Sequence, residues 1–287
     1  MRYIELSNLK NPVSRFIFGT SVNSMTGGEG ADTLLDNVFE EGVNTFDTAR
    51  VYGQSEKNLG QWIKKRNIRD KVNIITKGCH HDDVGSRVTK EDLIYDVELS
   101  LKSLETDYID IYLLHRDDPQ ISPEPMIDAL NDLMRQGKIL CFGASNWTHT
   151  RIEEANNYAK ENMIQGFLVS SPCFSAVKRV FDPWGGSVDI AGDSKAQAWY
   201  AENKMPVFAY SSLARGYLSG KGKNAPKEYI CTENEITLKR IEKEAEEKGL
   251  TVAQAAILRI LESDMTVCPI VSPTAVQHIK DIAACFI

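Results

Sequence analysis

The sequence predicts a single-domain (β/α)8 barrel, an α/β fold, over residues 1–287, and three observations support this prediction. A chain of 287 residues is long enough for one large barrel. Short β-branched runs alternate with longer amphipathic runs, which is typical of a parallel sheet. No linker, low-complexity tract or change of composition divides the chain. Eight strand–helix repeats favour closure into a TIM barrel over an open doubly wound sheet, and no GxGxxG fingerprint follows a strand.

The expected elements follow from hydrophobic period and from helix start and stop signals. Thr89 is the expected N-cap of one helix, and another has Pro123 near its start and Gly137 near its end. The expected strands cover residues 15–20, 43–48, 72–77, 107–115, 139–145, 164–171, 205–212 and 265–272. The expected helices cover residues 31–42, 55–66, 90–105, 123–138, 148–162, 194–204, 233–249, 251–263 and 274–287.

Two long segments between the expected elements, residues 173–193 and 211–232, are expected to be loops. Both follow strands, so both should lie on the C-terminal face of the barrel, where functional sites of this fold are built. Loops of this length in a compact domain are usually functional.

Composition and charge restrict the possible partners and compartment. The formal net charge of −7 and the pI of about 5.4 give no basic face for nucleic acid. No run of 18 apolar residues predicts a membrane span, and the N-terminus has no signal-peptide core. Six widely spaced cysteines form no CxxC pair, which favours reduced, buried thiols over disulfides or zinc. We therefore expect a cytoplasmic protein with no nucleic-acid or membrane partner; the sequence leaves its oligomeric state open.

Polar side chains follow several expected strands at the point where each strand ends. In the stretch NTFDTARVYGQ, Asp47 ends a strand and Tyr52 lies in the turn beyond it, while Lys77 and His115 end the next two strands. Further strand ends carry Ser145, Asn146, Tyr210, Ser211 and Ser212. A single polar strand end is most simply a terminus, but the carboxyl ends of parallel strands share one face. The pattern therefore predicts one polar site.

The residue types in this predicted site suit one kind of chemistry. A tyrosine has an ordinary pKa near 10, and a nearby lysine ammonium favours its phenolate form. An aspartate keeps the lysine charged and oriented, and a histidine can orient a substrate oxygen. Such a group suits proton donation to a carbonyl oxygen that is becoming an alkoxide. It supplies no electrons, so a hydride donor is required.

Motifs along nearly the whole chain resemble the aldo-keto reductase superfamily. They are FDTARVYGQSEKNLG, IITKG, DYIDIYLLHRDD, GKILCFGASNWT, FAYSSLARGYLSG and PIVSPT, each on its expected strand. The resemblance implies an NAD(P)H-dependent oxidoreductase that reduces aldehydes or ketones to alcohols, and the reverse. It implies NADP(H) or, alternatively, NAD(H) as cofactor and a small-molecule carbonyl substrate. It also implies Tyr52 as general acid, Lys77 and Asp47 as its tuning pair and His115 as the group that orients the substrate.

The same resemblance implies a set of cofactor-binding residues. Ser145 and Asn146 would bind the carboxamide, and Tyr210 would stack on the nicotinamide ring. The pyrophosphate would be held by Ser211, Ser212, Leu213 and Gly216. The full implied set is Gly19, Thr20, Asp47, Ser145, Asn146, Ser171, Tyr210, Ser211, Ser212, Leu213, Gly216, Ser272 and Thr274.

The chain departs from the family pattern in three places. Ser171 stands where the family usually has a Gln that helps to hold the carboxamide. Thr274 stands where an Arg or Lys usually meets the 2′-phosphate of NADP, and Lys280 or Arg215 is the possible substitute. The chain stops soon after its last helix, so we expect loops to shape the substrate pocket. Candidate lining residues are Phe181, Trp184 and Trp147.

Two other interpretations remain open from the sequence. CHHDD (residues 79–83) and HRDD (residues 115–118) carry metal-ligand types, as in metal-dependent hydrolases on this barrel, but no third cluster would complete a site near Tyr52, so no metal ligands are predicted. His80 is instead a candidate for substrate contacts. A second alternative is a nicotinamide-binding, redox-sensing regulatory subunit with little turnover, like the β-subunits of potassium channels. Sugars, steroids, aliphatic aldehydes and quinones all remain possible substrates.

Overall fold

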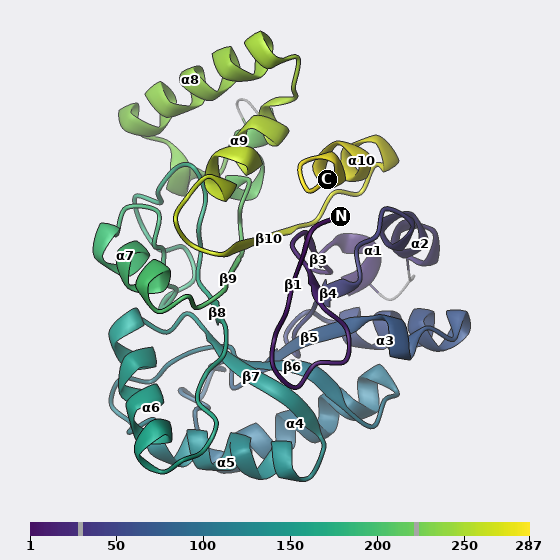
Figure 1. Cartoon of the computed structure of the whole chain (residues 1–287), viewed down its shortest axis with the longest axis vertical. Helices are drawn as coiled ribbons and strands as arrows, with labels where there is room; N and C mark the ends of the chain where they lie inside the picture. The colour runs from purple at the N-terminus through teal and green to yellow at the C-terminus, as the bar shows by residue number, and fades with distance from the viewer. Residues whose placement is uncertain (28–30, 221–223) are drawn as a thin grey trace.

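Eight parallel strands close a barrel in the computed structural model, which describes residues 1–27, 31–220 and 224–287 (Figure 1). The strands follow one another around the barrel in chain order, and β10 closes the ring by pairing with β3 through Ile270 and Ile17. The barrel strands are β3 (Ile17–Gly19), β4 (Thr45–Asp47), β5 (Asn73–Gly78), β6 (Ile109–Leu114), β7 (Ile139–Ser145), β8 (Ser170–Ser171), β9 (Val207–Ala209) and β10 (Val267–Val271). The predicted fold class is confirmed.

Helices surround the strands in the order that the alternating pattern predicts (Figure 1). Their bounds are α1 (Asn23–Thr26), α2 (Asp32–Glu40), α3 (Ser55–Arg66), α4 (Lys90–Leu104), α5 (Glu124–Arg135), α6 (His149–Glu161), α7 (Ser194–Glu202), α8 (Thr232–Lys248), α9 (Val252–Leu261) and α10 (Val276–Ala284). Short 3-10 turns are η1 (Arg69–Lys71), η2 (Ala214–Ser219) and η4 (Lys227–Tyr229). The last two turns lie within residues 211–232, which the sequence predicts to be a loop.

Local signals account for the helix boundaries. Thr89 caps α4 as expected, because its side chain accepts a hydrogen bond from the Asp92 backbone N–H. Thr251 and Gln254 form a reciprocal capping box at the start of α9. Gly249 takes a left-handed conformation directly after α8, with φ of 64°, which ends that helix.

Three apolar clusters make up the described core, and two of them pack on the barrel strands. The barrel interior is filled by side chains that the strands point inward, among them Ile75, Leu113 and Phe208. A larger layer lies between the strands and the helices, where Phe46 and Trp62 pack with ring centroids 5.1 Å apart. Five of the six cysteines are buried and all six are free thiols, as the sequence predicts. Close packing on both faces of the strands fixes where each strand ends, and therefore where the polar side chains lie.

The structure adds short elements that the pattern does not predict: α1, η1 and a pair of strands at the start of the chain. Strands β1 (Tyr3–Ile4) and β2 (Val13–Ser14) form an antiparallel pair ahead of the barrel. Val13 joins the apolar cluster inside the barrel, together with the partly buried Leu6 and Leu9. The pair therefore covers the interior at the end of the barrel remote from the strand carboxyl ends.

The sixth barrel strand is shorter than expected. Only Ser170–Ser171 form regular ladder pairs, although residues 164–171 read as a strand. The preceding segment still runs beside β7, because the Leu168 N–H donates to Phe142 O at 3.0 Å. A Cβ on Gly143 would lie 2.2 Å from Val169 O, so the two backbones approach more closely than a side chain allows.

Candidate active site

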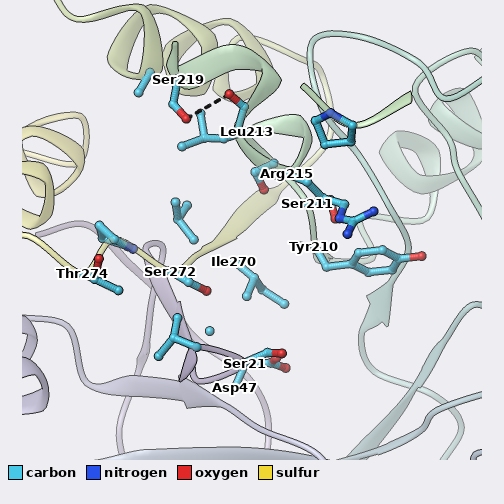
Figure 2. Close-up of a pocket in the computed structure, with 18 of the residues that line it drawn as sticks. Ser21, Asp47, Tyr210, Ser211, Leu213, Arg215, Ser219, Ile270, Ser272 and Thr274 are labelled. Atoms are coloured by element: carbon cyan, nitrogen blue, oxygen red, sulfur yellow. Dashed lines mark hydrogen bonds between the residues drawn. The ribbon is translucent and has the colours of Figure 1, made fainter. Parts of the chain in front are cut away.

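A cavity of about 1660 Å³ opens at the carboxyl ends of the strands. Its wall includes residues from all the strand ends that the sequence singled out. Figure 2 shows Asp47, Tyr210 and Ser211 among them. The predicted residues that line it are Gly19, Asp47, Tyr52, Lys77, His115, Ser145, Asn146, Tyr210, Ser211, Ser212, Leu213, Gly216, Ser272 and Thr274. Thr20 and Ser171 are fully buried behind this wall.

An ion pair joins two neighbouring strands at the base of the cavity. The Lys77 Nζ lies 2.6 Å from the Asp47 Oδ2, and only 4% and 5% of the two side chains is exposed. Lys77 Nζ also donates to the backbone oxygen of Thr48 at 2.9 Å. Tyr52 presents its ring to this ammonium, with Nζ 5.2 Å from the ring centroid. The structure thus brings together the three residues that the sequence placed on two strands and a loop.

Burial and charge set the protonation states of these groups. Burial acts to lower the pKa of Lys77, but the Asp47 carboxylate and Tyr52 outweigh it, and the pKa lies above its ordinary value. Burial raises the pKa of Tyr52 above 10, and the Lys77 ammonium opposes that rise. Lys77 is therefore a permanent cation at neutral pH, and Tyr52 holds its proton.

His115 completes the group from the end of β6. Its ring lies edge-on to Tyr52, with centroids 6.0 Å apart, and 4.8 Å from the ring of His80. Burial, and then the charge of Lys77, hold the pKa of His115 well below 6.5. The imidazole is therefore neutral at physiological pH and can donate one hydrogen bond to a substrate oxygen without carrying charge.

A second polar cluster follows β7 and β9. Asn146 has a left-handed backbone, with φ of 61°, which turns its side chain toward the cavity. Its amide Nδ2 donates to His115 O at 3.1 Å, and its Oδ1 accepts from the Tyr210 hydroxyl at 2.7 Å. Ser145 Oγ lies 3.1 Å from the same amide and donates to Ser171 O. The cluster therefore holds an amide, a hydroxyl and an aromatic ring in fixed positions on the wall.

Ser171 and Thr20 direct their hydroxyls into the protein. Ser171 Oγ donates to Phe208 O at 2.8 Å, and Thr20 Oγ1 donates to Asp47 O at 2.9 Å. Ser171 instead contributes its backbone oxygen, which accepts from Ser145. Both residues stand one layer behind the cavity and position residues that line it.

The segment after β9 forms a concave run of backbone amides. Ser211, Ala214, Arg215 and Gly216 have φ values of 54°, 49°, 54° and 98°. Within the described chain, the N–H groups of Ser212, Leu213 and Arg215 have no acceptor. Consecutive amides in such left-handed turns make an anion-binding concavity. Figure 2 shows this segment facing Ser272 and Thr274 across the cavity.

Neither cation that the sequence proposed for the 2′-phosphate of NADP is free on the cavity wall near Thr274, at the end of the cavity far from Tyr52. Arg215 forms an ion pair with Glu228, and Lys280 is exposed and is not part of the described wall. The wall there contains Thr274 and Asp281, and the Asp281 carboxylate accepts from Gln277 Nε2 at 2.8 Å.

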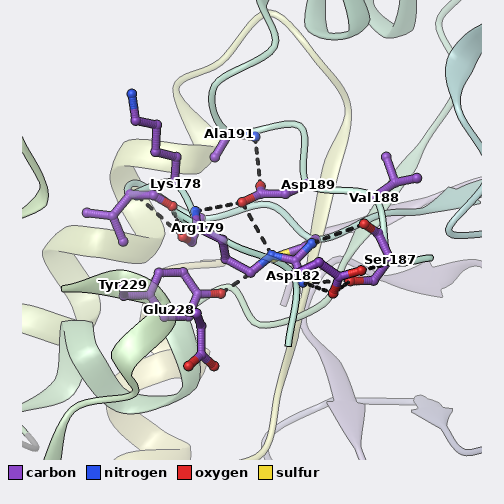
Figure 3. A network of polar contacts seen from close by, with 12 residues as sticks. Lys178, Arg179, Asp182, Ser187, Val188, Asp189, Ala191, Glu228 and Tyr229 are labelled. Atoms are coloured by element: carbon purple, nitrogen blue, oxygen red, sulfur yellow. Dashed lines mark hydrogen bonds and ion pairs between the residues drawn. The ribbon is translucent and has the colours of Figure 1, made fainter. Parts of the chain in front are cut away.

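The loop between β8 and α7 is organised by one arginine. Arg179 donates to Ser187 Oγ at 2.7 Å and pairs with Asp182 and Asp189, as Figure 3 shows. Trp184, in the same loop, lies over the guanidinium at 5.5 Å. Phe181 and Trp184 line the cavity, as their positions in the sequence predict. Trp147, the third candidate, is fully buried, does not line it and donates to Arg116 O at 3.0 Å.

Sequence reasoning missed Arg116, which follows His115 and lines the cavity. Its only sequence signal is its place next to a strand-end histidine.

The candidate metal motifs do not converge: within the described residues, no group of three or more His, Cys, Asp or Glu side chains gathers to hold an ion. The structured part of the chain also contains no helix that is both long and apolar enough to cross a membrane.

Comparisons with known proteins agree with this geometry. The family model "Aldo/keto reductase family" matches residues 17–287. The chain is 28% identical to the protein named "Aldo-keto reductase AFTS1" of Alternaria alternata, over 86% of this chain and 75% of that protein. It is 29% identical to "Probable aryl-alcohol dehydrogenase AAD4" of Saccharomyces cerevisiae, over 88% of this chain and 81% of that protein. It is also 28% identical to "Aldo-keto reductase YhdN" of Bacillus subtilis, over 77% of this chain and 65% of that protein.

These relatives are oxidoreductases, and the family acts on small-molecule carbonyl compounds and generally uses NAD(P)H. A match over nearly the whole barrel, on a chain that closes eight parallel strands around a polar cavity, leads to one conclusion. The protein is an oxidoreductase that belongs to the aldo/keto reductase family.

Proposed function

We propose that the protein reduces aldehydes or ketones to alcohols with NAD(P)H, and catalyses the reverse reaction, with Tyr52 as general acid. One observation carries the proposal: the buried Lys77–Asp47 pair lies under the Tyr52 ring, with His115 beside it. The four side chains come from three strand ends and one loop, and they line a single cavity.

Each residue has a role that follows from its charge state. Tyr52 holds the proton that a carbonyl oxygen takes as it becomes an alkoxide. Lys77 stabilises the phenolate that remains, and Asp47 keeps the ammonium charged in a buried position. His115, a neutral imidazole, orients the substrate oxygen by a hydrogen bond. A bound reduced nicotinamide supplies the hydride that this chemistry requires.

The cavity fits an extended dinucleotide. The free amides of Ser212, Leu213 and Arg215 suit a pyrophosphate. Asn146 and Ser145 offer an amide and a hydroxyl for a carboxamide, and Tyr210 offers a ring for stacking. Gly19 also lines the cavity, at a position where a Cβ would lie 2.6 Å from Ser272 Oγ.

The cofactor preference that the wall supports is NAD(H) over NADP(H). A 2′-phosphate carries most of two negative charges and requires a cation. The proposed substitutes are otherwise engaged, because Arg215 pairs with Glu228 and Lys280 lies off the wall; Lys227 is the one described lysine besides Lys77 that lines the cavity. Asp281 places a carboxylate there instead, which would repel a phosphate but accept a hydrogen bond from a ribose hydroxyl.

The proposal is tested by Tyr52→Phe, with Tyr95→Phe as the matched control, because Tyr95 is an exposed tyrosine on α4. We expect kcat for a simple aldehyde to fall about 10²- to 10⁴-fold in Tyr52→Phe, while NADH still quenches tryptophan fluorescence with a similar Kd. Turnover equal to the wild type would contradict the assignment. Tight NADH binding by a wild type without turnover would favour the redox-sensing regulatory subunit.

A further inference from the structure

Arg116 is a buried cation that nothing in the described chain neutralises. Only 8% of the residue is exposed, and it lines the same cavity as Tyr52 and His115. Its Nε is buried without a hydrogen-bond partner, and its single side-chain hydrogen bond runs from Nη1 to His115 O at 3.4 Å. No described carboxylate lies within 4.0 Å of its nitrogens.

Most other partly buried arginines of this protein pair with carboxylates; the exception, Arg15, donates to the backbone oxygen of Val267. Arg69 lies 2.8 Å from Asp110, Arg87 lies 3.0 Å from Asp96, and Arg179 pairs with Asp182 and Asp189. The carboxylate next to Arg116 in the chain, Asp117, is already bound at 3.0 Å by Arg151.

Among the charged groups around Tyr52, the Arg116 guanidinium is the one cation of the described chain without a counter-charge. Lys77 is balanced by Asp47, while His115 is held neutral and Tyr52 is protonated. Burying an unpaired charge is costly, so a protein keeps one where a ligand completes it. A guanidinium presents a rigid fork of donors that matches a carboxylate in bidentate geometry.

We propose that Arg116 binds the carboxylate of the carbonyl substrate, so that the preferred substrates are aldehydes or ketones that carry an acid group. This inference rests on the proposed function, because it assigns the substrate class of the same site. Arg116 directly follows His115, so the carboxylate would bind close to the reacting carbonyl. Trp147 supports the position, since its Nε1 holds the backbone oxygen of Arg116 at 3.0 Å.

The test compares an acid with its uncharged ester on the same aldehyde. Purified protein is assayed with 3- and 4-carboxybenzaldehyde and with the methyl ester of each. We expect kcat/KM for an acid to exceed that for its ester by about 10- to 100-fold, the usual strength of a hydrogen bond to a charged group. In Arg116→Met the ratio should fall toward one, and Arg116→Lys should retain part of it. Arg240→Met removes an exposed arginine on α8 and should leave the ratio as it is.

A binding measurement separates this inference from the proposed function. Benzoate is titrated against the NADH-loaded protein, and quenching of tryptophan fluorescence is followed. We expect saturable binding that weakens at least tenfold in Arg116→Met, while the Kd for NADH alone stays within about twofold of the wild type. If no aldehyde is turned over, the proposed function fails, and benzoate binding alone decides whether Arg116 is an anion site.

Three results would overturn the assignment. The first is equal kcat/KM for acid and ester in the wild type, together with no benzoate binding. The second is an equal loss for acid and ester in Arg116→Met with a shifted pH profile, which would mean that Arg116 acts through Tyr52. The third is weaker NADH binding in that variant, which would place Arg116 in the cofactor site. Thermal unfolding is the structural control: removing an unpaired buried charge should leave Tm equal or higher.

Discussion

The Lys77 ammonium lies 2.6 Å from the Asp47 carboxylate, where β4 and β5 end side by side, and both side chains are almost fully buried. A buried pair of this kind contributes little net stability, but removing one partner leaves an uncompensated charge. Its position under the Tyr52 ring fits the proposed role in proton transfer.

This relationship predicts different outcomes for single and double replacement. Lys77→Met should lower kcat for aldehyde reduction about 10²-fold or more and destabilise the protein by about 3–5 kcal/mol, because Asp47 is left buried and unpaired. The double variant Asp47→Asn/Lys77→Met should regain most of the stability but none of the activity. Urea unfolding and steady-state kinetics measure the two effects. Lys239→Met, an exposed lysine on α8, is the control. Recovery of activity in the double variant would show that the pair acts only structurally.

The pH dependence should differ between the two directions of the reaction. Burial holds the pKa of Tyr52 above 10, and burial with Lys77 holds the pKa of His115 well below 6.5. In the proposed mechanism reduction needs protonated Tyr52, so kcat should be flat between these values and fall as pH rises through the pKa of Tyr52. Oxidation needs the phenolate, so its rate should climb over the same alkaline range. Rate profiles in both directions provide the measurement, and a reduction rate that falls between pH 7 and 9 would contradict the assignment.

The cofactor preference should reverse when the charge at the far end of the cavity is reversed. Asp281→Arg, alone or with Thr274→Arg, should strengthen NADPH binding at least tenfold relative to NADH, since a hydrogen bond to a charged group contributes about 1.5–3 kcal/mol. Asp264→Arg makes the same charge change at an exposed site that does not line the cavity. Fluorescence titration with both cofactors gives the two Kd values. A wild-type protein that binds NADPH more tightly than NADH would contradict the argument before any variant is made.

Most of the fold and of the candidate site could be predicted from two features of the sequence: the hydrophobic period of the elements and the polar residues at the strand ends. The helix over residues 55–66 and the strand over residues 139–145 have the expected bounds, because each has a clear period and a clear boundary. The two-residue strands β1 and β2 are too short to show any period, so no pattern could reveal them. Asp47, Tyr52, Lys77 and His115 meet as expected, because parallel strands all end on one face.

The features that the sequence could not predict depend on tertiary contacts. Ser171 directs its hydroxyl at Phe208 O rather than into the cavity, which depends on the irregular start of its strand. Arg116 is notable only because no described carboxylate pairs with it, and a missing contact leaves no trace in a sequence. The paired state of Arg215 likewise depends on how the segment that carries Glu228 folds back.

The loop that carries Trp184 should depend on Arg179 for its shape. Only 3% of the Arg179 side chain is exposed, and it contacts Ser187 and Asp189. Arg179→Met would leave Asp189 without its cation, at a cost of about 3 kcal/mol or more. Trp184 lies 5.1 Å from Arg215 as well, so it should stay near the cavity but lose its fixed position.

We therefore expect Arg179→Met to raise KM for bulky aromatic aldehydes severalfold, with a smaller effect on a short aliphatic aldehyde that does not reach the loop. Tryptophan fluorescence should report a more solvated Trp184, and hydrogen exchange should rise within residues 175–192 only. Lys178→Met is the control, because its ammonium pairs with Glu233 on the outside of the loop. An equal change in KM for both aldehydes would show that the loop is not part of the substrate wall. Phe181 and Trp184 are the aromatic side chains that this loop adds to the cavity wall. A Trp184 ring held in one position should therefore affect the binding of bulky aldehydes more than that of short ones.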